Sequence, residues 1–442
     1  MTRAPGGLDG CPAVADADSR PAITGDLLRY GLALAGPIGS AGAQFLLSLV
    51  LLRHVDPAGF GRFSFLLIAS QLGSAVWSAL FLAPLPQVLS TTAADAQAVP
   101  VRAMISANLC GVLLALLPLA LVARSVGEDW GAVALFVGYA ALALMRGFAR
   151  ALGYARAQQR RVSASDLLYS VVLLIGTALL FGGTVRGTGG AYAVFLVATG
   201  AGLIAFGPTF LAEQVSGFGL AHLRSYRGIW RAHGRWSLLG VVTSEATGNA
   251  HAYLVTGFLG AGAFAPLAAA AILIRPITVV SNALIEFERS RIARALGAGD
   301  PNEARRAVLL FRVILLLSWI ATAAAAAALL WFDPRLIYPA QYHIHVLAIG
   351  AALWMATALL RVLRVPESAL LQAGGAFRPL ALASLWSAFV SVAAVAVLLL
   401  VAPPLWSIAG IALGDAMCAL LIIRAAGRWY GRASASALSP QP

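Results

Sequence analysis

The segments VDPAGFGRFSFLLIASQLGSAVWSAL (55–80) and LGAGAFAPLAAAAILIRPITVVSNAL (259–284) align without a gap at an offset of 204 residues. Residues of the same kind recur at matching positions, namely Phe60 and Phe264, Ile68 and Ile272, Val76 and Val280, and Arg102 and Arg306. Each segment joins a short turn to a long apolar run, and a basic loop follows both. This ungapped alignment predicts that the chain contains two copies of one helical unit.

The composition places these units in a membrane. Sixty per cent of the 442 residues are hydrophobic, only 11% are charged, and the mean hydropathy is +0.84. Soluble domains contain about 25% charged residues. The chain is therefore predicted to be an all-α polytopic membrane protein.

A spanning helix needs about 20 predominantly apolar residues. The sequence contains twelve such runs, at 27–52, 63–89, 101–123, 131–153, 165–183, 189–212, 236–258, 264–286, 308–331, 344–365, 379–402 and 404–424. Six spans per half is an even number, so the two halves share one orientation and are parallel repeats about an axis along the membrane normal. Two parallel six-helix bundles that face a central cavity indicate a transporter working by alternating access.

The basic residues predict the orientation. All 31 are arginines. With the N-terminus in the cytoplasm, 25 of them lie in or beside cytoplasmic loops, five lie on the other side, and Arg275 alone lies in mid-membrane. This bias follows the positive-inside rule and predicts that both termini are cytoplasmic. It also excludes a nucleic-acid partner as the reason for a pI near 10.6, because the charge faces the anionic inner leaflet.

These spans divide the chain into five predicted parts. They are a polar cytoplasmic tail at 1–24, a first bundle at 25–212, a connector at 213–235, a second bundle at 236–425 and a cytoplasmic tail at 426–442. The connector is basic and aromatic, so it is expected to lie along the cytoplasmic interface as an amphipathic segment.

The sequence contains no motif that is typical of an enzyme active site. The three cysteines, Cys11, Cys110 and Cys418, form no metal-binding spacing and no disulfide framework. The chain has no Walker A loop, no nucleophile elbow and no paired carboxylates in a polar loop. We expect no catalytic residue, metal or cofactor.

Arg275 is the most informative single residue. It lies about 16 Å from either end of its span, farther than an arginine side chain can reach toward water. A charge at that depth costs about 2.5–3.5 kcal/mol on translocon scales. It therefore either pairs with a buried acid, such as Glu245 or Asp415, or binds an anionic substrate through its bidentate fork. Pro276 lacks an N–H and predicts a kink beside it.

Other polar residues within spans are candidates for binding or coupling. Glu245 and Asn249 form one stripe on span seven, where Glu245 is a candidate for ion coupling or for pairing with Arg275. His251 is expected near the periplasmic end as a wet interfacial residue, and Asp415 as a buried helix-packing acid. The basic candidates are Arg29 on span one and Arg146 and Arg150 on span four, which form either a cytoplasmic mouth for the substrate or ordinary positive-inside anchors. Pro37 in span one is a candidate gate hinge.

Short motifs along both halves resemble those of the polysaccharide-export and O-antigen flippases, a family of the multidrug/oligosaccharidyl-lipid/polysaccharide (MOP) superfamily. They are VDPAGFGRFSF (55–65), LGAGAFAPLAAA (259–270), RIARALGAGDPNEARRA (291–307), FDPRLIYPAQY (332–342), ALLQAGGAFRPLALAS (369–384) and SIAGIALGDAMCALLI (407–422). The resemblance covers roughly residues 25–425. Asp56 and Pro266 depart from the family pattern.

The resemblance implies a MOP-type fold and the movement of an undecaprenyl-diphosphate-linked oligosaccharide across the bacterial cytoplasmic (inner) membrane. Relatives use arginines on spans one, two and eight in a central cavity. Arg275 matches this pattern on span eight, Arg29 opens span one, and span two carries Gln71 at the position equivalent to Arg275. The expected partners are the lipid-linked oligosaccharide, the bilayer, and polysaccharide polymerase and chain-length proteins.

Two rival functions remain. An ion-coupled multidrug antiporter of the same superfamily would need an acidic, aromatic cavity rather than a mid-membrane arginine. A membrane glycan polymerase or ligase would need a large periplasmic loop, and no outer loop here exceeds about a dozen residues.

Overall fold

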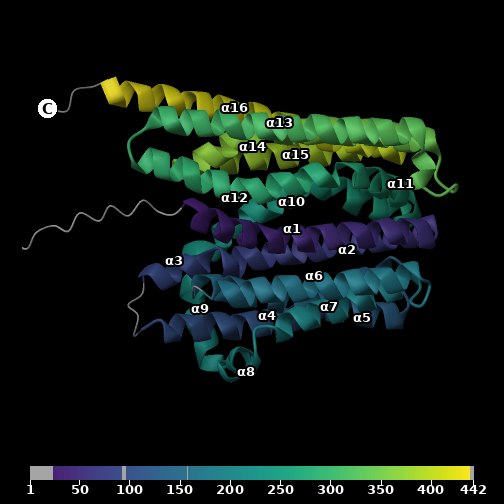
Figure 1. Ribbon diagram of the computed structural model, residues 1–442, viewed down its shortest axis with the longest axis horizontal. Helices are drawn as coiled ribbons and strands as arrows, with labels where there is room; N and C mark the ends of the chain where they lie inside the picture. Colours follow the sequence, from purple (N-terminus) through teal and green to yellow (C-terminus); the bar gives the residue numbers. More distant parts are fainter. Residues whose placement is uncertain (1–22, 92–95, 157, 439–442) are drawn as a thin grey trace, which may run out of the picture.

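The computed structural model describes residues 23–91, 96–156 and 158–438, and every regular element among them is a helix. The long helices run side by side, with those of the first half of the chain in one layer and those of the second half in another (Figure 1). The start of α1 (Ile23–His54) and the end of α16 (Ser407–Leu438) lie at the same end of the molecule. We call this end the terminal end and the opposite one the distal end.

The first half contains a long helix for each predicted span. These helices are α1, α2 (Pro57–Trp77), α4 (Ala98–Ser125), α5 (Trp130–Ala155), α6 (Gln159–Phe181) and α7 (Gly187–Ile204). Span two continues from α2 through a π-helical turn, Ser78–Leu82, and then α3, Pro84–Thr91. Span six is shorter than predicted: α7 ends at Ile204, because Gly207 at φ +88° and Pro208 turn the chain into α8 (Pro208–Ser216).

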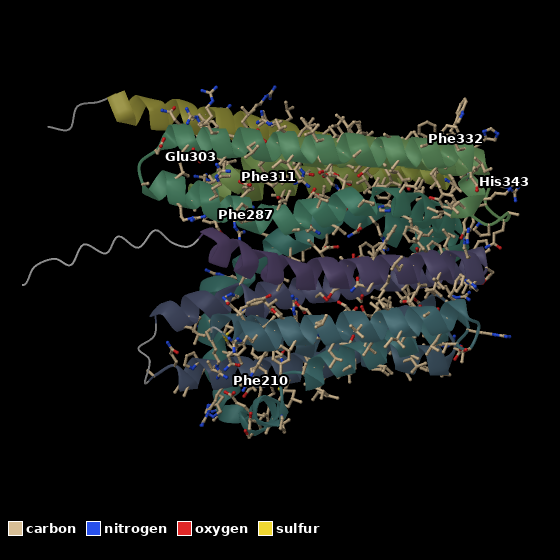
Figure 2. The ribbon with its side chains drawn as sticks, in the orientation of Figure 1. Phe210, Phe287, Glu303, Phe311, Phe332 and His343 are labelled. Carbon is tan, nitrogen blue, oxygen red and sulfur yellow. The ribbon has the colours of Figure 1, made fainter. Side chains whose placement is uncertain are left out.

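The second half follows the same plan. After α9 (Leu220–Ile229) and a π-helical turn, its helices are α10 (Arg235–Leu259), α11 (Ala261–Ala271), α12 (Arg275–Gly297), α13 (Pro301–Phe332), α14 (Ile344–Ala373), α15 (Phe377–Val401) and α16. Figure 2 shows Glu303 near the terminal end and Phe332 and His343 at the distal end, so α13 runs the length of the molecule.

The number of spans agrees with the sequence. Within the described residues, ten helical segments are long and apolar enough to cross a bilayer, and residues 38–54 of α1 form a shorter apolar helix. The remaining span is α10, which is 25 residues long and carries Glu245, Asn249 and His251. The twelve predicted spans therefore each coincide with helical structure.

Aspartates begin several of these helices. Asp56 Oδ1 accepts from the amide of Gly59 at 3.2 Å, and Asp129 Oδ1 accepts from Gly131 at 2.8 Å. Asp300 accepts from the amides that open α13. A carboxylate at this position satisfies amides that have no partner within the helix. The acidic residue in the turn before α2 therefore has a local structural role.

Span eight is broken in its middle. The α-helix α11 ends at Ala271, a 3₁₀ turn follows at Ile272–Ile274, and α12 begins at Arg275 with Pro276 in its first turn. Proline has no N–H to donate to the preceding turn, and its ring crowds the carbonyl four residues back. The distortion predicted at Pro276 is thus present as a change from 3₁₀ to α-helix. Arg275 is the first residue after this change.

The two halves touch most closely near the distal end, where α2 packs against α11. A Cβ atom on Gly61 would lie 1.9 Å from the carbonyl oxygen of Ala261. The backbones are therefore in direct contact, and only glycine fits at this position.

Hydrogen bonds between the halves lie beside this contact. Arg53 Nη2 donates to the carbonyl oxygen of Arg335 at 3.0 Å and also to that of Leu336. Gln341 Nε2 donates to the carbonyl oxygen of Val55 at 3.2 Å. Together with the helix contact, these bonds close the distal end.

The packing of α2 against span eight loosens toward the terminal end, where α1 still contacts α12 and α10 still contacts the π-helical turn after α2. Residues 59–70 of α2 are mostly buried, whereas Gln71 is exposed. In span eight, residues 264–274 are almost all buried, Arg275 is half-buried and Pro276 is exposed. Gln71 and Arg275 are equivalent positions of the repeat. Both helices therefore change from buried to more exposed residues at the same repeat position.

Candidate functional site

Arg275 extends from the break in span eight toward span one of the other half. Its Nη1 donates to Ser48 Oγ at 3.0 Å. In the part of the chain that the structure describes, no carboxylate lies within ion-pairing distance of it. The alternative pairing with Glu245 or Asp415 is not formed, because those acids contact other residues. Arg275 is thus a charged group in mid-span with one neutral partner.

A second arginine centre lies inside the first half. Arg146 Nη2 is 2.6 Å from Asp166 Oδ1, and Arg150 reaches the same carboxylate through Nε at 2.8 Å and Nη2 at 2.9 Å. The guanidinium of Arg146 also lies 4.3 Å from the ring centroid of Tyr169, a cation–π contact. Asp166 is 2% exposed. Two cations on one buried anion leave this cluster with a net charge of about +1.

Glycine makes room for this cluster. A Cβ on Gly202 would lie 2.7 Å from Arg146 Nε and 3.0 Å from the carbonyl oxygen of Ser165. Arg146 Nε donates to Ser165 Oγ at 3.0 Å, so α7 must pass close to the arginine. Any side chain at position 202 would push the guanidinium away from its partners.

The first-half cluster faces a cavity of about 260 Å³. Gln71, Arg146 and Arg150 all line it, with Tyr139 and Tyr169. The structure therefore brings together three of the residues for which substrate binding was predicted. Arg146 and Arg150 lie within the bundle, where a buried acid holds them.

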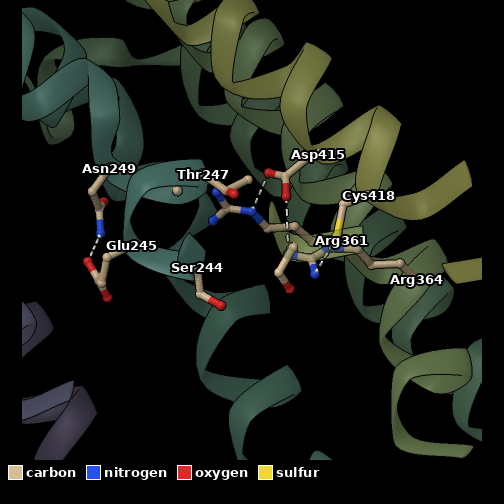
Figure 3. Close-up of a pocket in the computed structure, with 10 residues that line it drawn as sticks. Ser244, Glu245, Thr247, Asn249, Arg361, Arg364, Asp415 and Cys418 are labelled. Atoms are coloured by element: carbon tan, nitrogen blue, oxygen red, sulfur yellow. Dashed lines mark hydrogen bonds and ion pairs between the residues drawn. The ribbon is translucent and has the colours of Figure 1, made fainter. Parts of the chain in front are cut away.

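A third centre occupies the second half, on α14 and α16 (Figure 3). Arg361 Nε donates to Asp415 Oδ2 at 2.8 Å, and Arg364 Nη2 donates to Asp415 Oδ1 at 3.1 Å. Asp415 is fully buried. Arg146 and Arg361 each lie on the fourth spanning helix of their half, whereas the acids come from different helices, the fifth span in the first half and the sixth in the second.

The second-half cluster lines a cavity of about 240 Å³. Glu245 lies on the opposite wall, where its Oε2 accepts from Asn249 Nδ2 at 2.7 Å (Figure 3). The predicted stripe of Glu245 and Asn249 is thus formed. No arginine lies within ion-pairing distance of Glu245 among the described residues. Asp415 is a buried acid, as expected, and it also holds two arginines.

Sequence reasoning missed Asp166, Arg361 and Arg364. The two arginines were assigned to the positive-inside bias, and Asp166 lies close to the start of its span. A signal was present: Arg361 and Arg364 lie three residues apart on one face of a helix, and Asp166 is an acid at the edge of an apolar run. Their pairing across helices could not be read from the sequence.

The expectation for His251 was wrong. This residue is 2% exposed and is enclosed by aromatic rings, with centroids 5.1 Å from Trp354 and 5.8 Å from Phe264. Neither a carboxylate nor water-exposed surface lies beside it in the described structure. The aromatic rings of α11 and α14 cover it because these helices pack together within the second half.

The side chains of Arg29 and Pro37 lie outside the described residues, although both positions fall within α1. Pro276 lies at the break in span eight, as described above. Among the described residues, no group of three histidine, cysteine or acidic side chains could hold a metal ion.

No protein-family model matches the sequence, and no curated protein matches it. Solved structures do share its fold. An inward-facing conformation of a multidrug resistance MATE family transporter of the MOP superfamily has a TM-score of 0.65 at 14% identity, over 93% of this chain and 100% of the other. An outward-facing conformation of such a transporter has a TM-score of 0.58 at 15% identity, over 92% and 96%.

A third similar structure is a MOP superfamily transporter from Pyrococcus furiosus, with a TM-score of 0.60 at 15% identity over 91% of this chain and 95% of the other. It is described as having a binding pocket of reversed polarity that suggests a different function. At these identities the similarity establishes the fold. The chain is a multi-pass membrane protein with the fold of the MATE transporters of the MOP superfamily.

Proposed function

We propose that this protein moves an undecaprenyl-diphosphate-linked oligosaccharide from the inner to the outer leaflet of the bacterial cytoplasmic membrane. The observation that carries the proposal is Arg275, a mid-span cation whose one hydrogen-bond partner among the described residues is the hydroxyl of Ser48. An unneutralised charge at that depth is expensive unless an anion comes to it. A diphosphate is such an anion, and the planar guanidinium matches its oxygens.

The other arginine centres support a cationic path. Arg146 and Arg150 share one acid, and so do Arg361 and Arg364. The first-half cluster keeps a net positive charge of about one, whereas the carboxylate of Glu245 balances the second-half cluster within its cavity. Arg275 and the first-half cluster favour anions and oppose the organic cations that a drug exporter would carry.

The conformation fits the loading step. The charge distribution predicts that the terminal end is cytoplasmic. The closed distal end would then face outward, and Gln71 and Arg275 would lie on the cytoplasmic side of that closure. The higher TM-score for the inward-facing neighbour agrees with this assignment.

Outward movement of the diphosphate is favoured by an inside-negative potential, by about 2.3 kcal/mol per charge per 100 mV.

The second candidate function is an ion-coupled multidrug antiporter with the same fold. One observation favours it: Glu245 is a membrane-interior carboxylate that bonds to Asn249 rather than to an arginine. Such a group can exchange a proton or a cation with the cavity. Coupling of this kind is also compatible with lipid-linked oligosaccharide transport, so Glu245 alone does not separate the two functions.

The deciding experiment combines deletion and reconstitution. Deletion of the gene is expected to leave a lipid-linked oligosaccharide on the inner leaflet, identified by mass spectrometry of extracted lipids. Proteoliposomes that contain the full chain are then expected to expose that lipid on the opposite leaflet, whereas an organic cation dye is not transported. Unchanged surface polysaccharide together with dye transport would establish the antiporter instead.

A further inference from the structure

A surface groove of about 610 Å³ lies between α15 and α16 near the terminal end. Three arginines line it, Arg378 from the first turn of α15 and Arg424 and Arg428 one turn apart on α16. All three are exposed. In the described part of the chain, no carboxylate pairs with any of them. The groove therefore concentrates three unneutralised positive charges at one place.

The remaining wall of the groove is apolar. Leu382, Trp386, Leu421 and Ala425 line it. Trp386 is 58% exposed and Leu382 is 49% exposed. The apolar wall continues along α15 through exposed Leu385 and Phe389. The groove thus joins a cationic rim to a strip of helix that faces hydrocarbon.

Trp386 lies two turns, about 12 Å, from Arg378 along α15 and inside the predicted span. Its large apolar ring can therefore pack on the acyl chain of a lipid whose head group lies at Arg378. The N-terminus of a 25-residue helix also adds a partial positive charge beside Arg378. A ligand that fits must carry an anionic head and an acyl chain that follows the apolar strip.

We propose that this groove binds an anionic phospholipid of the surrounding leaflet. The phosphate lies among Arg378, Arg424 and Arg428, and an acyl chain packs on Leu382 and Trp386. Basic pockets between spanning helices on the cytoplasmic side suit such head groups. The groove shares no lining residue with the cavities of the arginine centres, so the proposal does not depend on the transported substrate.

The test uses the full chain in phosphatidylcholine vesicles with spin-labelled phosphatidylglycerol as the probe. Electron paramagnetic resonance measures how strongly the labelled lipid is selected over labelled phosphatidylcholine. In R378Q/R424Q/R428Q this selectivity is expected to fall at least about five-fold, the effect of one arginine near a membrane surface. Trp386→Ala is expected to weaken the immobilisation of labelled acyl chains without removing the preference for the anionic head.

The matched control is R160Q/R161Q/R227Q, which removes three exposed arginines from the first half and the connector. It loses the same charge but leaves the groove intact, so its selectivity should fall much less than that of R378Q/R424Q/R428Q. An equal fall in both triple variants, or no fall in R378Q/R424Q/R428Q, would overturn the proposal. Displacement of the probe by inorganic phosphate would assign the groove to a free anion, and displacement by a polyprenyl diphosphate at equal concentration would assign it to the carrier lipid. Either result would also reject the phospholipid.

Discussion

Gln71 and Arg275 occupy equivalent positions of the internal repeat, and each marks the point at which its helix passes from buried to exposed. They therefore lie at one level of the molecule, where the close packing of α2 against span eight ends. The repeat is symmetric in backbone and asymmetric in charge at this level, since one half supplies a neutral amide and the other a guanidinium.

Replacing Arg275 is expected to remove transport and leave the fold intact. Arg275→Ala deletes the charge, while Ser48 keeps its bond to the carbonyl oxygen of Gln44 at 2.9 Å. The free energy of unfolding should change by no more than about 1 kcal/mol. Lipid flipping in proteoliposomes should be abolished, and Arg275→Lys should restore it only partly, because an ammonium lacks the bidentate fork. Full transport by Arg275→Ala would show that this arginine does not bind the substrate.

Removing the acid at the centre of the second-half cluster is expected to destabilise the protein. Asp415→Asn leaves Arg361 and Arg364 without their shared anion, and these two side chains are 34% and 26% exposed. The loss should therefore be smaller than for a fully buried pair, about 1.5–3 kcal/mol, as for hydrogen bonds to a charged group. Thermal unfolding in detergent measures the effect. Glu303→Gln is the control, since both side chains of its ion pair with Arg291 are half-exposed and the pair should contribute about 1 kcal/mol or less. Equal shifts in both variants would contradict the central role of Asp415.

Gly61→Ala is expected to open the distal end. Its methyl group would lie 1.9 Å from the carbonyl oxygen of Ala261, so that α2 and α11 must move apart. Spin labels at Thr184 and Leu336, both exposed at that end, would report a longer distance by double electron–electron resonance. Gly262→Ala is the matched control, because its Cβ would lie 3.9 Å from that of Ala58, an ordinary contact. An unchanged distance in Gly61→Ala would show that this contact does not hold the halves together.

The attachment of the connector should weaken in acid. Arg156 bonds both oxygens of Glu213, at 2.7 and 2.6 Å. The hydrogen bonds from Arg156 lower the pKa of the Glu213 carboxyl below its ordinary value. The folded state therefore binds the proton less readily than the unfolded state, so the stabilisation is present above the unfolded pKa and is lost as the pH falls through the folded pKa.

Hydrogen exchange of α8 amides, corrected for the intrinsic pH dependence, measures this effect. Protection should decrease as the pH falls through the folded pKa of Glu213. Glu213→Gln should already have low protection at neutral pH and should show no further loss. The same pH dependence in Glu213→Gln would assign the effect to another group.

Hydropathy and the repeat were sufficient to predict the helices. Apolar runs of the length of a bilayer have few alternatives to a spanning helix, and Pro276 predicted the break in span eight. The end of span six was misplaced, because Gly207 and Pro208 turn the chain at a point where hydropathy does not change. The burial of His251 was not predicted either, since its cover comes from Trp354, more than a hundred residues away in sequence.

The sequence by itself determined the number of spans, their parallel halves and the isolation of Arg275 within an apolar run. These properties depend on local composition, because the length of an apolar run determines whether it spans the bilayer. Only the tertiary structure decided which arginines are neutralised. Asp166 and Asp415 each reach two arginines on another helix, and that contact depends on how the helices pack and on glycines such as Gly202 that let them approach. Pairing energy depends on distances of a few ångströms between side chains, and the sequence order does not specify those distances.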